Sequence, residues 1–240
     1  MHVFYDPDIL NNSGILNEEE SRHCVKVLRH KEGDLIKVIT GQGECYTCTI
    51  IEASVKRCRL KIESRESAKK SSTVCHIAIA PTKSIDRFEW FIEKSTELGI
   101  DKITPILCHQ SERKQIRLSR LEKVIISATK QSLRFWKPSI TELTNLKDFL
   151  LANHPEKLKF IAYCDEKVER QPLSAQLLDR DKTQSVLILI GPEGDFTEEE
   201  VTIAIDQGFI PISLGRNRLR TETAGISACM TVRLMESLHK

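Results

Sequence analysis

After residue 74 the chain alternates short apolar runs with amphipathic segments, and this alternation limits the possible folds more than any other feature. Each run is rich in Ile, Val and Leu and is short for a helix. Parallel strands are buried on both faces and are joined by crossover helices, so we expect an α/β domain over residues 71–240. Its predicted strands are 74–80, 102–107, 158–164, 185–190 and 209–214.

The segments between these runs carry helix signals. Phe88 and Phe91 fall on one helical face, and Gly99 stands where that helix would end. Thr197 and Glu200 have the spacing of a capping box, which predicts a helix start just after the fourth apolar run. Strands and helices therefore alternate to the end of the chain.

Residues 1–70 have a different pattern. Apolar runs at 35–40, 45–51 and 58–62 are separated by turn residues, which predicts a small β-barrel or sheet. The polar stretch 63–73, ESRESAKKSST, is expected to be a linker. We therefore place a domain boundary after residue 70.

Composition excludes some classes of protein. The formal net charge is only +2, so any contact with nucleic acid must come from local clusters of Lys and Arg. The eight cysteines are scattered, and only Cys45 and Cys48 form a C-x-x-C, so we expect reduced thiols and no metal site. The start of the chain lacks a signal-peptide pattern, and no apolar stretch approaches a membrane span. We expect a cytoplasmic protein that does not bind membranes.

The loop after the fourth predicted strand, residues 190–197, reads IGPEGDFT. It lacks both common phosphate-loop patterns, and Glu193 and Asp195 would repel a pyrophosphate. Such a loop suits an adenosine without phosphates or a ligand with positive charge, and S-adenosylmethionine, a sulfonium, meets both conditions. A plain turn between strand and helix would explain this motif equally well if it stood alone. A nucleotide-dependent dehydrogenase is disfavoured, because the glycine fingerprint is missing.

A second polar segment, SLGRNRLRTETA, follows the last predicted strand at residues 213–224. In this order, IGPEGDFTEEEV and SLGRNRLRTETA resemble the ribosomal RNA small subunit methyltransferase E family, which belongs to the SPOUT class of knotted methyltransferases. The segments PTKSIDRFEWFIEKSTELGIDKITPIL (81–107), ATKQSLR (128–134) and HCVKVLRHKEGD (23–34) are also similar to that family. The resemblance covers nearly the whole chain.

This resemblance implies a fold, a cofactor and partners. Residues 1–70 would form a PUA-like RNA-binding β-barrel, and residues 71–240 a SPOUT α/β domain with a trefoil knot at its carboxyl end. The protein would be a homodimer whose partner subunit helps to build the site for S-adenosylmethionine. The cofactor-binding residues implied by the family are Ile190, Gly191, Pro192, Glu193, Gly194, Ser213, Leu214, Gly215, Leu219, Arg220, Thr221, Glu222, Thr223 and Ala224.

The family's reaction is methylation of N3 of one uridine, nucleotide 1498, in the 16S ribosomal RNA of the small subunit. N3–H is weakly acidic, so the site must stabilise negative charge on the base or remove the proton. Arg220 is the first catalytic candidate, and Glu222 is either a base or an orienting group. No metal is required. The expected RNA-binding residues are His23, Lys26, Arg29, Lys83, Arg113 and Arg134.

Asp195 and Arg218 depart from the family pattern, where a glycine and an apolar residue are usual. The nearest alternative is another SPOUT methyltransferase, acting on transfer RNA or on a different ribosomal position. A second alternative is a ribosome-assembly protein that binds RNA but does not catalyse. For His23, Lys26 and Arg29, a merely solvated surface is the competing interpretation.

Overall fold

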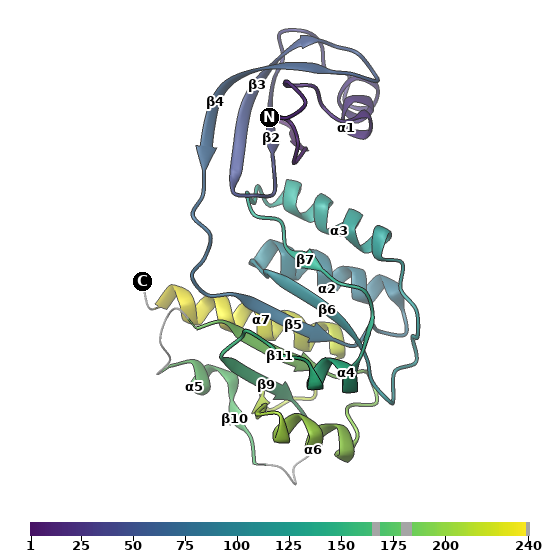
Figure 1. The fold of residues 1–240 in the computed structure, drawn as a ribbon, viewed down its shortest axis with the longest axis vertical. Helices are drawn as coiled ribbons and strands as arrows, with labels where there is room; N and C mark the ends of the chain where they lie inside the picture. Colours follow the sequence, from purple (N-terminus) through teal and green to yellow (C-terminus); the bar gives the residue numbers. More distant parts are fainter. Residues whose placement is uncertain (165–168, 179–183, 239–240) are drawn as a thin grey trace. The chain divides into compact units, whose positions relative to one another are not determined.

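The computed structural model describes residues 1–164, 169–178 and 184–238. They form two compact units: Met1–Lys70 with Ile126–Lys137, and Ser71–Ile125 with Pro138–Lys240 (Figure 1). We call them the amino-terminal and the catalytic unit. The sequence placed residues 126–137 in the second domain, whereas in the structure this segment packs with the first.

Contacts from distant parts of the chain explain the placement of residues 126–137. Gly43 N–H donates to the carbonyl of Phe135 at 2.8 Å. The Trp136 indole N–H donates to the carbonyl of Ala68, also at 2.8 Å. These are pairings between residues far apart in sequence, so local patterns gave no sign of them.

The amino-terminal unit contains a four-stranded sheet in the order β1-β2-β3-β4. β1 pairs with β2 in parallel, and the other pairs are antiparallel. Ile15 bridges to Arg59 and so extends the sheet past β4. The elements are β1 (Val3–Tyr5), α1 (Glu18–Arg22), the π-helical turn η1 (His23–Val27), β2 (Leu35–Ile39), β3 (Glu44–Glu52) and β4 (Arg59–Ser67).

The expected linker at 63–73 is wrong over its first part, because β4 continues to Ser67. The side chains there are polar, yet the backbone pairs with β3 along its length. Charged contacts across the strands add to this pairing: Arg65 meets Glu44, and Lys37 lies 2.9 Å from Glu66. This part of β4 is therefore stabilised by backbone pairing and charged contacts. Its side chains are polar, so the strand is not predicted by an alternation of hydrophobic and polar residues.

The described part of the catalytic unit contains an all-parallel sheet in the order β10-β12-β9-β11-β5-β6-β7, with β8 also paired to β6. The α/β prediction is therefore confirmed, and the trefoil knot stays a prediction. The strands are β5 (Cys75–Ile79), β6 (Lys102–Leu107), β7 (Ser139–Ile140), β8 (Thr144–Asn145), β9 (Leu158–Ala162), β10 (Gln171–Pro172), β11 (Val186–Ile190) and β12 (Ile210–Ser213). The helices are α2 (Ile85–Leu98), α4 (Leu146–Leu151), α5 (Leu173–Leu178), α6 (Glu198–Asp206) and α7 (Thr221–Leu238), while α3 (Leu118–Gln131) begins here and ends in the amino-terminal unit.

Each central strand buries both of its faces. In β5, Ile77 and Ile79 pack with residues of α2 and α7, whereas Ala78 packs in a second cluster with residues of α4 and α6. α2 and α7 approach closely at Gly225, where a Cβ would lie 2.6 Å from the Phe91 ring. The capping box of Thr197 is present at the start of α6, and Gly99 ends α2 with φ 110°. This packing on both faces fixes the ends of the strands that form the functional site.

None of the helices within the described ranges is long and apolar enough to cross a membrane. All eight cysteine thiols are free, and seven of them are buried. Among the described residues, no group of three or more His, Cys, Asp or Glu side chains could hold a metal ion.

A buried polar network lies at the amino-terminal end of β5. His76, fully buried, contacts Glu156 through Nδ1 at 2.8 Å and Thr104 through Nε2 at 2.9 Å. Burial lowers the pKa of His76 below its ordinary value of 6.5, and this outweighs the opposite effect of Glu156. A neutral imidazole can donate to the carboxylate and accept from the hydroxyl, so it satisfies both contacts.

This network predicts a pH dependence of stability. Because the folded state depresses the pKa of His76, its contribution is full above pH 6.5 and is lost as pH falls toward the folded-state pKa. Below pH 6.5 the free energy of unfolding should fall by up to about 1.4 kcal/mol per pH unit from this residue alone. Urea unfolding between pH 7.5 and pH 5 should show a flatter profile in His76→Gln. Equal slopes in the wild type and the variant would contradict the assignment, and His109→Gln, at an exposed position, is the control.

Candidate functional site

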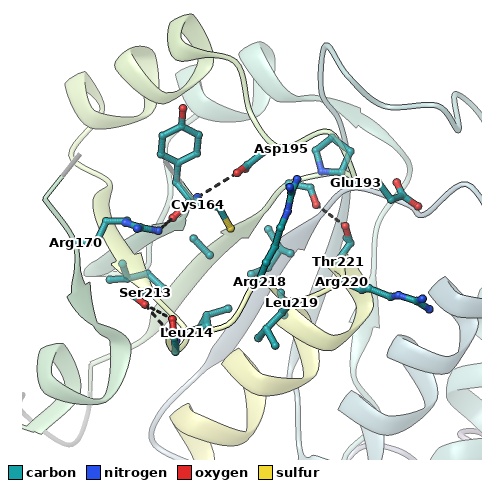
Figure 2. Close-up of a pocket in the computed structure, with 18 residues that line it drawn as sticks. Cys164, Arg170, Glu193, Asp195, Ser213, Leu214, Arg218, Leu219, Arg220 and Thr221 are labelled. Atoms are coloured by element: carbon teal, nitrogen blue, oxygen red, sulfur yellow. Dashed lines mark hydrogen bonds between the residues drawn. The ribbon is translucent and has the colours of Figure 1, made fainter. Parts of the chain in front are cut away.

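A cavity of about 320 Å³ opens at the carboxyl ends of β9, β11 and β12, the edge where ligands bind in open α/β sheets (Figure 2). Three segments of the catalytic unit build it: the end of β9 with Arg170, the loop after β11, and the loop from β12 to the start of α7. The lining residues are Ala162, Tyr163, Cys164, Arg170, Ile190, Gly191, Pro192, Glu193, Asp195, Ile212, Ser213, Leu214, Gly215, Arg218, Leu219, Arg220, Thr221 and Ala224.

The loop after β11 is held in shape by its own contacts. Asp195 N–H donates to the carbonyl of Pro192 at 2.9 Å and closes a turn. Asp195 has φ 66°, a left-handed conformation that costs a non-glycine residue about 1–2 kcal/mol. Its carboxylate offsets that cost by accepting from the N–H groups of Cys164 at 3.1 Å and Phe196 at 2.8 Å. The loop is thereby tied to the end of β9.

The two polar motifs meet at the first residue of α7. Thr221 Oγ1 donates to the carbonyl of Gly191 at 3.0 Å, and both residues are buried. After β12, Ser213 Oγ accepts from Gly215 N–H at 3.2 Å and donates to the Gly215 carbonyl at 2.9 Å. Gly215 has φ 137°, which favours glycine there. Two motifs that are separate in the sequence therefore form one site.

The cavity carries charges of both signs. Glu193 and Asp195 come from the loop after β11, and Arg170, Arg218 and Arg220 come from other segments. In Figure 2 Arg218 extends along the middle of the cavity, whereas Arg220 extends away from it at its edge. A phosphate loop would present free backbone N–H groups, but Asp195 already occupies two of the amides nearby. The loop after β11 therefore differs from a phosphate loop, and its two carboxylates can attract a cationic group, while the three arginines come from the other segments of the cavity.

Most of the expected cofactor residues line this cavity. Gly194 does not line it, and packs instead against Gln110. Thr223 is also outside the lining and is exposed. The expected residues that do line it are Ile190, Gly191, Pro192, Glu193, Ser213, Leu214, Gly215, Leu219, Arg220, Thr221 and Ala224.

Glu222, the second catalytic candidate, is also absent from the lining. Its side chain is 6% exposed, and its Oε1 lies 4.0 Å from Nε of Arg87. Since Arg87 belongs to α2, this contact joins the starts of α2 and α7. The position supports an orienting role for Glu222 over direct contact with a substrate.

Sequence reasoning missed the contribution of β9 to the cavity. Tyr163, Cys164 and Arg170 line it, although they belong to no motif. Arg170 donates to the carbonyl of Tyr163. One signal was available in the sequence. Residues 158–164 were predicted as a strand, and ligand-binding residues of open α/β sheets lie at the carboxyl ends of parallel strands.

The expected RNA contacts divide between the two units. His23, Lys26 and Arg29 are exposed on η1 and just after it, in the amino-terminal unit. Arg134 belongs to the same unit and is partly buried. Lys83 and Arg113 lie together in the catalytic unit, where Arg113 donates to the carbonyl of Lys83.

Comparison with known proteins adds the family. The RNA methyltransferase domain family matches residues 68–233, and the RNA methyltransferase PUA domain family matches residues 16–63. Ribosomal RNA small subunit methyltransferase E of Rickettsia conorii is 30% identical over 240 residues, which cover 98% of this chain and 96% of that protein. The chain belongs to the ribosomal RNA small subunit methyltransferase E family.

Solved structures of similar proteins agree with this family. A probable rRNA-methyltransferase from Porphyromonas gingivalis matches with a TM-score of 0.90 and 38% identity, over 100% of both chains. Ribosomal RNA small subunit methyltransferase E from Neisseria gonorrhoeae, solved with S-adenosyl methionine bound, gives a TM-score of 0.84 and 26% identity, over 99% of this chain and 98% of that one. The expected fold of the methyltransferase E family, a PUA-like domain followed by a parallel-sheet α/β domain, is confirmed.

Proposed function

We propose that this protein transfers a methyl group from S-adenosylmethionine to N3 of uridine 1498 in the 16S ribosomal RNA of the small subunit. The observation that carries the proposal is the cavity at the ends of β9, β11 and β12, where the two family motifs meet. In the loop after β11, Asp195 occupies two backbone amides near the cavity, and Glu193 and Asp195 can attract the cationic group of the cofactor. The chain's membership of the methyltransferase E family supports the reaction class.

The cavity offers the surfaces that such a cofactor needs. Ile190, Leu214 and Leu219 provide apolar contact for an adenine ring. The carboxylates of Glu193 and Asp195 supply negative charge for a sulfonium or an ammonium group. When bound, the cofactor supplies an electrophilic methyl group. The protein's task is to align the uracil nitrogen with that methyl group and to exclude water.

Arg220 is the group that we assign to the base itself. Loss of the N3 proton leaves negative charge on the uracil oxygens, and a guanidinium at the cavity edge can stabilise it. The Arg220 carbonyl accepts from Ala224 N–H at 2.8 Å, so its backbone is fixed at the start of α7 while its side chain is exposed. Glu222 is better placed to orient α7 through Arg87 than to accept a proton.

Direct titration with S-adenosylmethionine tests the cofactor assignment. Isothermal calorimetry should show one site per chain, with S-adenosylhomocysteine competing for it. A protein that binds small-subunit RNA but neither of these ligands would be the non-catalytic assembly protein instead. If the protein binds the cofactor but methylates transfer RNA or another ribosomal position, the cofactor assignment stands and the proposed target is wrong.

RNA binding is assigned to His23, Lys26 and Arg29, which are exposed on one short segment of the amino-terminal unit. The triple replacement by alanine should weaken binding to small-subunit RNA and make log Kd less steep against log salt, by up to about 0.7–0.9 per lost phosphate contact. Lys56→Ala with Arg57→Ala, exposed in the same unit, is the matched control. Identical affinities and salt slopes in the triple variant and the wild type would leave these residues as a solvated surface.

We further propose a homodimer in the cytoplasm. Met230, Leu234 and Leu238 recur every fourth residue along α7 and are 46%, 48% and 68% exposed. An apolar stripe of this kind on a helix is suited to packing against a second copy of the same surface. Since α7 also begins at the cofactor cavity, a partner packed here would lie on the helix that carries Thr221 and Ala224.

A further inference from the structure

The segment 108–113, which follows β6, has a compact shape of its own, and we call it the strap. Cys108 N–H donates to Ser111 Oγ at 3.0 Å, and Ser111 N–H donates back to the Cys108 carbonyl at 3.1 Å. Both residues are buried. Two reciprocal hydrogen bonds in four residues give a closed turn, so the strap can act as a fixed support.

The strap contacts the cofactor loop, residues 191–195, and the helix that follows it. His109 N–H donates to Oε1 of Glu200 at 2.8 Å, and Glu200 is also the capping-box residue of α6. Gln110 fills the space beside Gly194, where a Cβ would lie 2.2 Å from Gln110 Oε1. The strap therefore supports both the loop itself and the start of α6.

Arg113 makes a third connection, through the residues just before α2. Its Nε donates to the carbonyl of Thr82 at 2.9 Å, and its Nη2 donates to the carbonyl of Lys83 at 2.5 Å. Lys83 N–H in turn donates to Oε1 of Glu193 at 2.9 Å, and Glu193 lines the cofactor cavity. Arg113 thus binds the carbonyls of residues 82 and 83, while Glu193 binds the N–H of Lys83.

The hydrogen bonds from Arg113 to residues 82–83 and from Lys83 to Glu193 strengthen one another. A guanidinium bound to two successive carbonyls lies next to the peptide groups whose N–H meets the Glu193 carboxylate. Hydrogen bonds in series polarise one another, so the Lys83 N–H becomes a stronger donor to Glu193. The Lys83 ammonium lies 2.7 Å from Glu112, so it is paired at the surface and leaves the backbone contact to Glu193 undisturbed.

We propose that Arg113 is a positioning residue for the cofactor loop, acting through residues 82–83 and Glu193, and that it is not a contact to RNA phosphate. Its fork of donors sets where Glu193 lies at the edge of the cavity. This inference rests on the proposed function for the identity of the cofactor. It replaces the RNA-binding role that the sequence suggested for Arg113.

The test compares Arg113→Ala and Arg113→Lys with Arg117→Ala, an exposed arginine in the same connection, all in the full-length protein. Arg113→Ala should raise the Kd for S-adenosylmethionine about tenfold, the scale of a lost charged hydrogen bond. The Kd for small-subunit RNA and its salt slope should not change. Arg113→Lys should recover part of the cofactor affinity, since an ammonium reaches a carbonyl but lacks the planar fork. Arg117→Ala should match the wild type in both assays.

A second readout needs no cofactor. Amide hydrogen exchange at Lys83, whose N–H donates to Glu193, should be faster in Arg113→Ala than in Arg117→Ala under conditions where both variants are folded. In the background of Glu193→Gln, Arg113→Ala should cost little further cofactor affinity, because the two residues act in series.

Two results would overturn the proposal: unchanged cofactor Kd and exchange in Arg113→Ala, or an RNA Kd that rises with a shallower salt slope. If the wild type binds no S-adenosylmethionine, the proposed function fails. Hydrogen exchange then still decides whether Arg113 positions the loop. If Arg113→Ala does not fold, the same measurements on Arg113→Lys decide the question.

Discussion

Replacing Arg220 by alanine should lower kcat for methyl transfer by about 100- to 1000-fold, the range seen when one oxyanion-stabilising donor is removed. The Kd for S-adenosylmethionine should stay close to that of the wild type. The reason is the position of Arg220: its backbone fixes the start of α7, whereas its exposed side chain extends away from the middle of the cavity (Figure 2). Single-turnover assays with labelled cofactor separate the chemical step from binding.

Arg216→Ala is the matched control, because Arg216 is exposed in the same loop and does not line the cavity. Its turnover should equal that of the wild type. If Arg220→Ala retains more than a tenth of the wild-type kcat, Arg220 is not the group that stabilises the base. A large rise in cofactor Kd with little change in kcat would assign Arg220 to cofactor binding instead.

The largest expected effect on stability is that of Arg233→Ala, near the end of α7. The Arg233 side chain is only 14% exposed, and it contacts Asp101, Glu236 and the carbonyls of Gly99 and Thr73. Removing it leaves partly buried carboxylates and carbonyls without their donor. Breaking a buried ion pair in this way costs about 3–5 kcal/mol.

Urea unfolding at neutral pH measures this loss. Arg216→Ala, an exposed arginine, should stay within about 0.5 kcal/mol of the wild type. Because Arg233 joins the last helix to the segments around β5 and α2, the variant that still folds should also bind the cofactor less tightly. A loss below about 1 kcal/mol would mean that the network exchanges with water and does not anchor α7.

Local patterns predicted the centre of the catalytic unit well, for physical reasons. β5 and β11 are buried on both faces, so each appears in the sequence as an apolar run, which in β5 is interrupted by His76. The capping box at Thr197 and the glycine at the end of α2 also depend only on neighbouring residues. Elements of this kind are visible in a single sequence because their stabilising contacts are local or uniformly apolar.

The remaining features depend on distant contacts. The end of β4 is a strand through pairing with β3, although its side chains are polar. Residues 126–137 join the amino-terminal unit through hydrogen bonds to turns near residues 43 and 68. The short elements β7, β8 and β10 are two residues long, too short for any periodicity.

The candidate site shows the same division. The motif loops were predicted because their residue types and order resemble a known family. Arg170 was missed, because it belongs to neither motif and lies outside the predicted strand 158–164. Arg113 was expected to contact RNA, and its hydrogen bonds to the carbonyls of Thr82 and Lys83 join it to residues about 30 positions earlier in the chain, which local patterns do not indicate.

Methyl transfer to isolated small ribosomal subunits tests the central claim most directly. The subunits would come from bacterial cells that lack their own enzyme for this position, and would be incubated with this protein and labelled S-adenosylmethionine. Mapping the label by nuclease digestion and mass spectrometry should find one N3-methyluridine, at nucleotide 1498 of 16S ribosomal RNA. Label at any other nucleotide, or none from a protein that binds the cofactor, would contradict the proposed target.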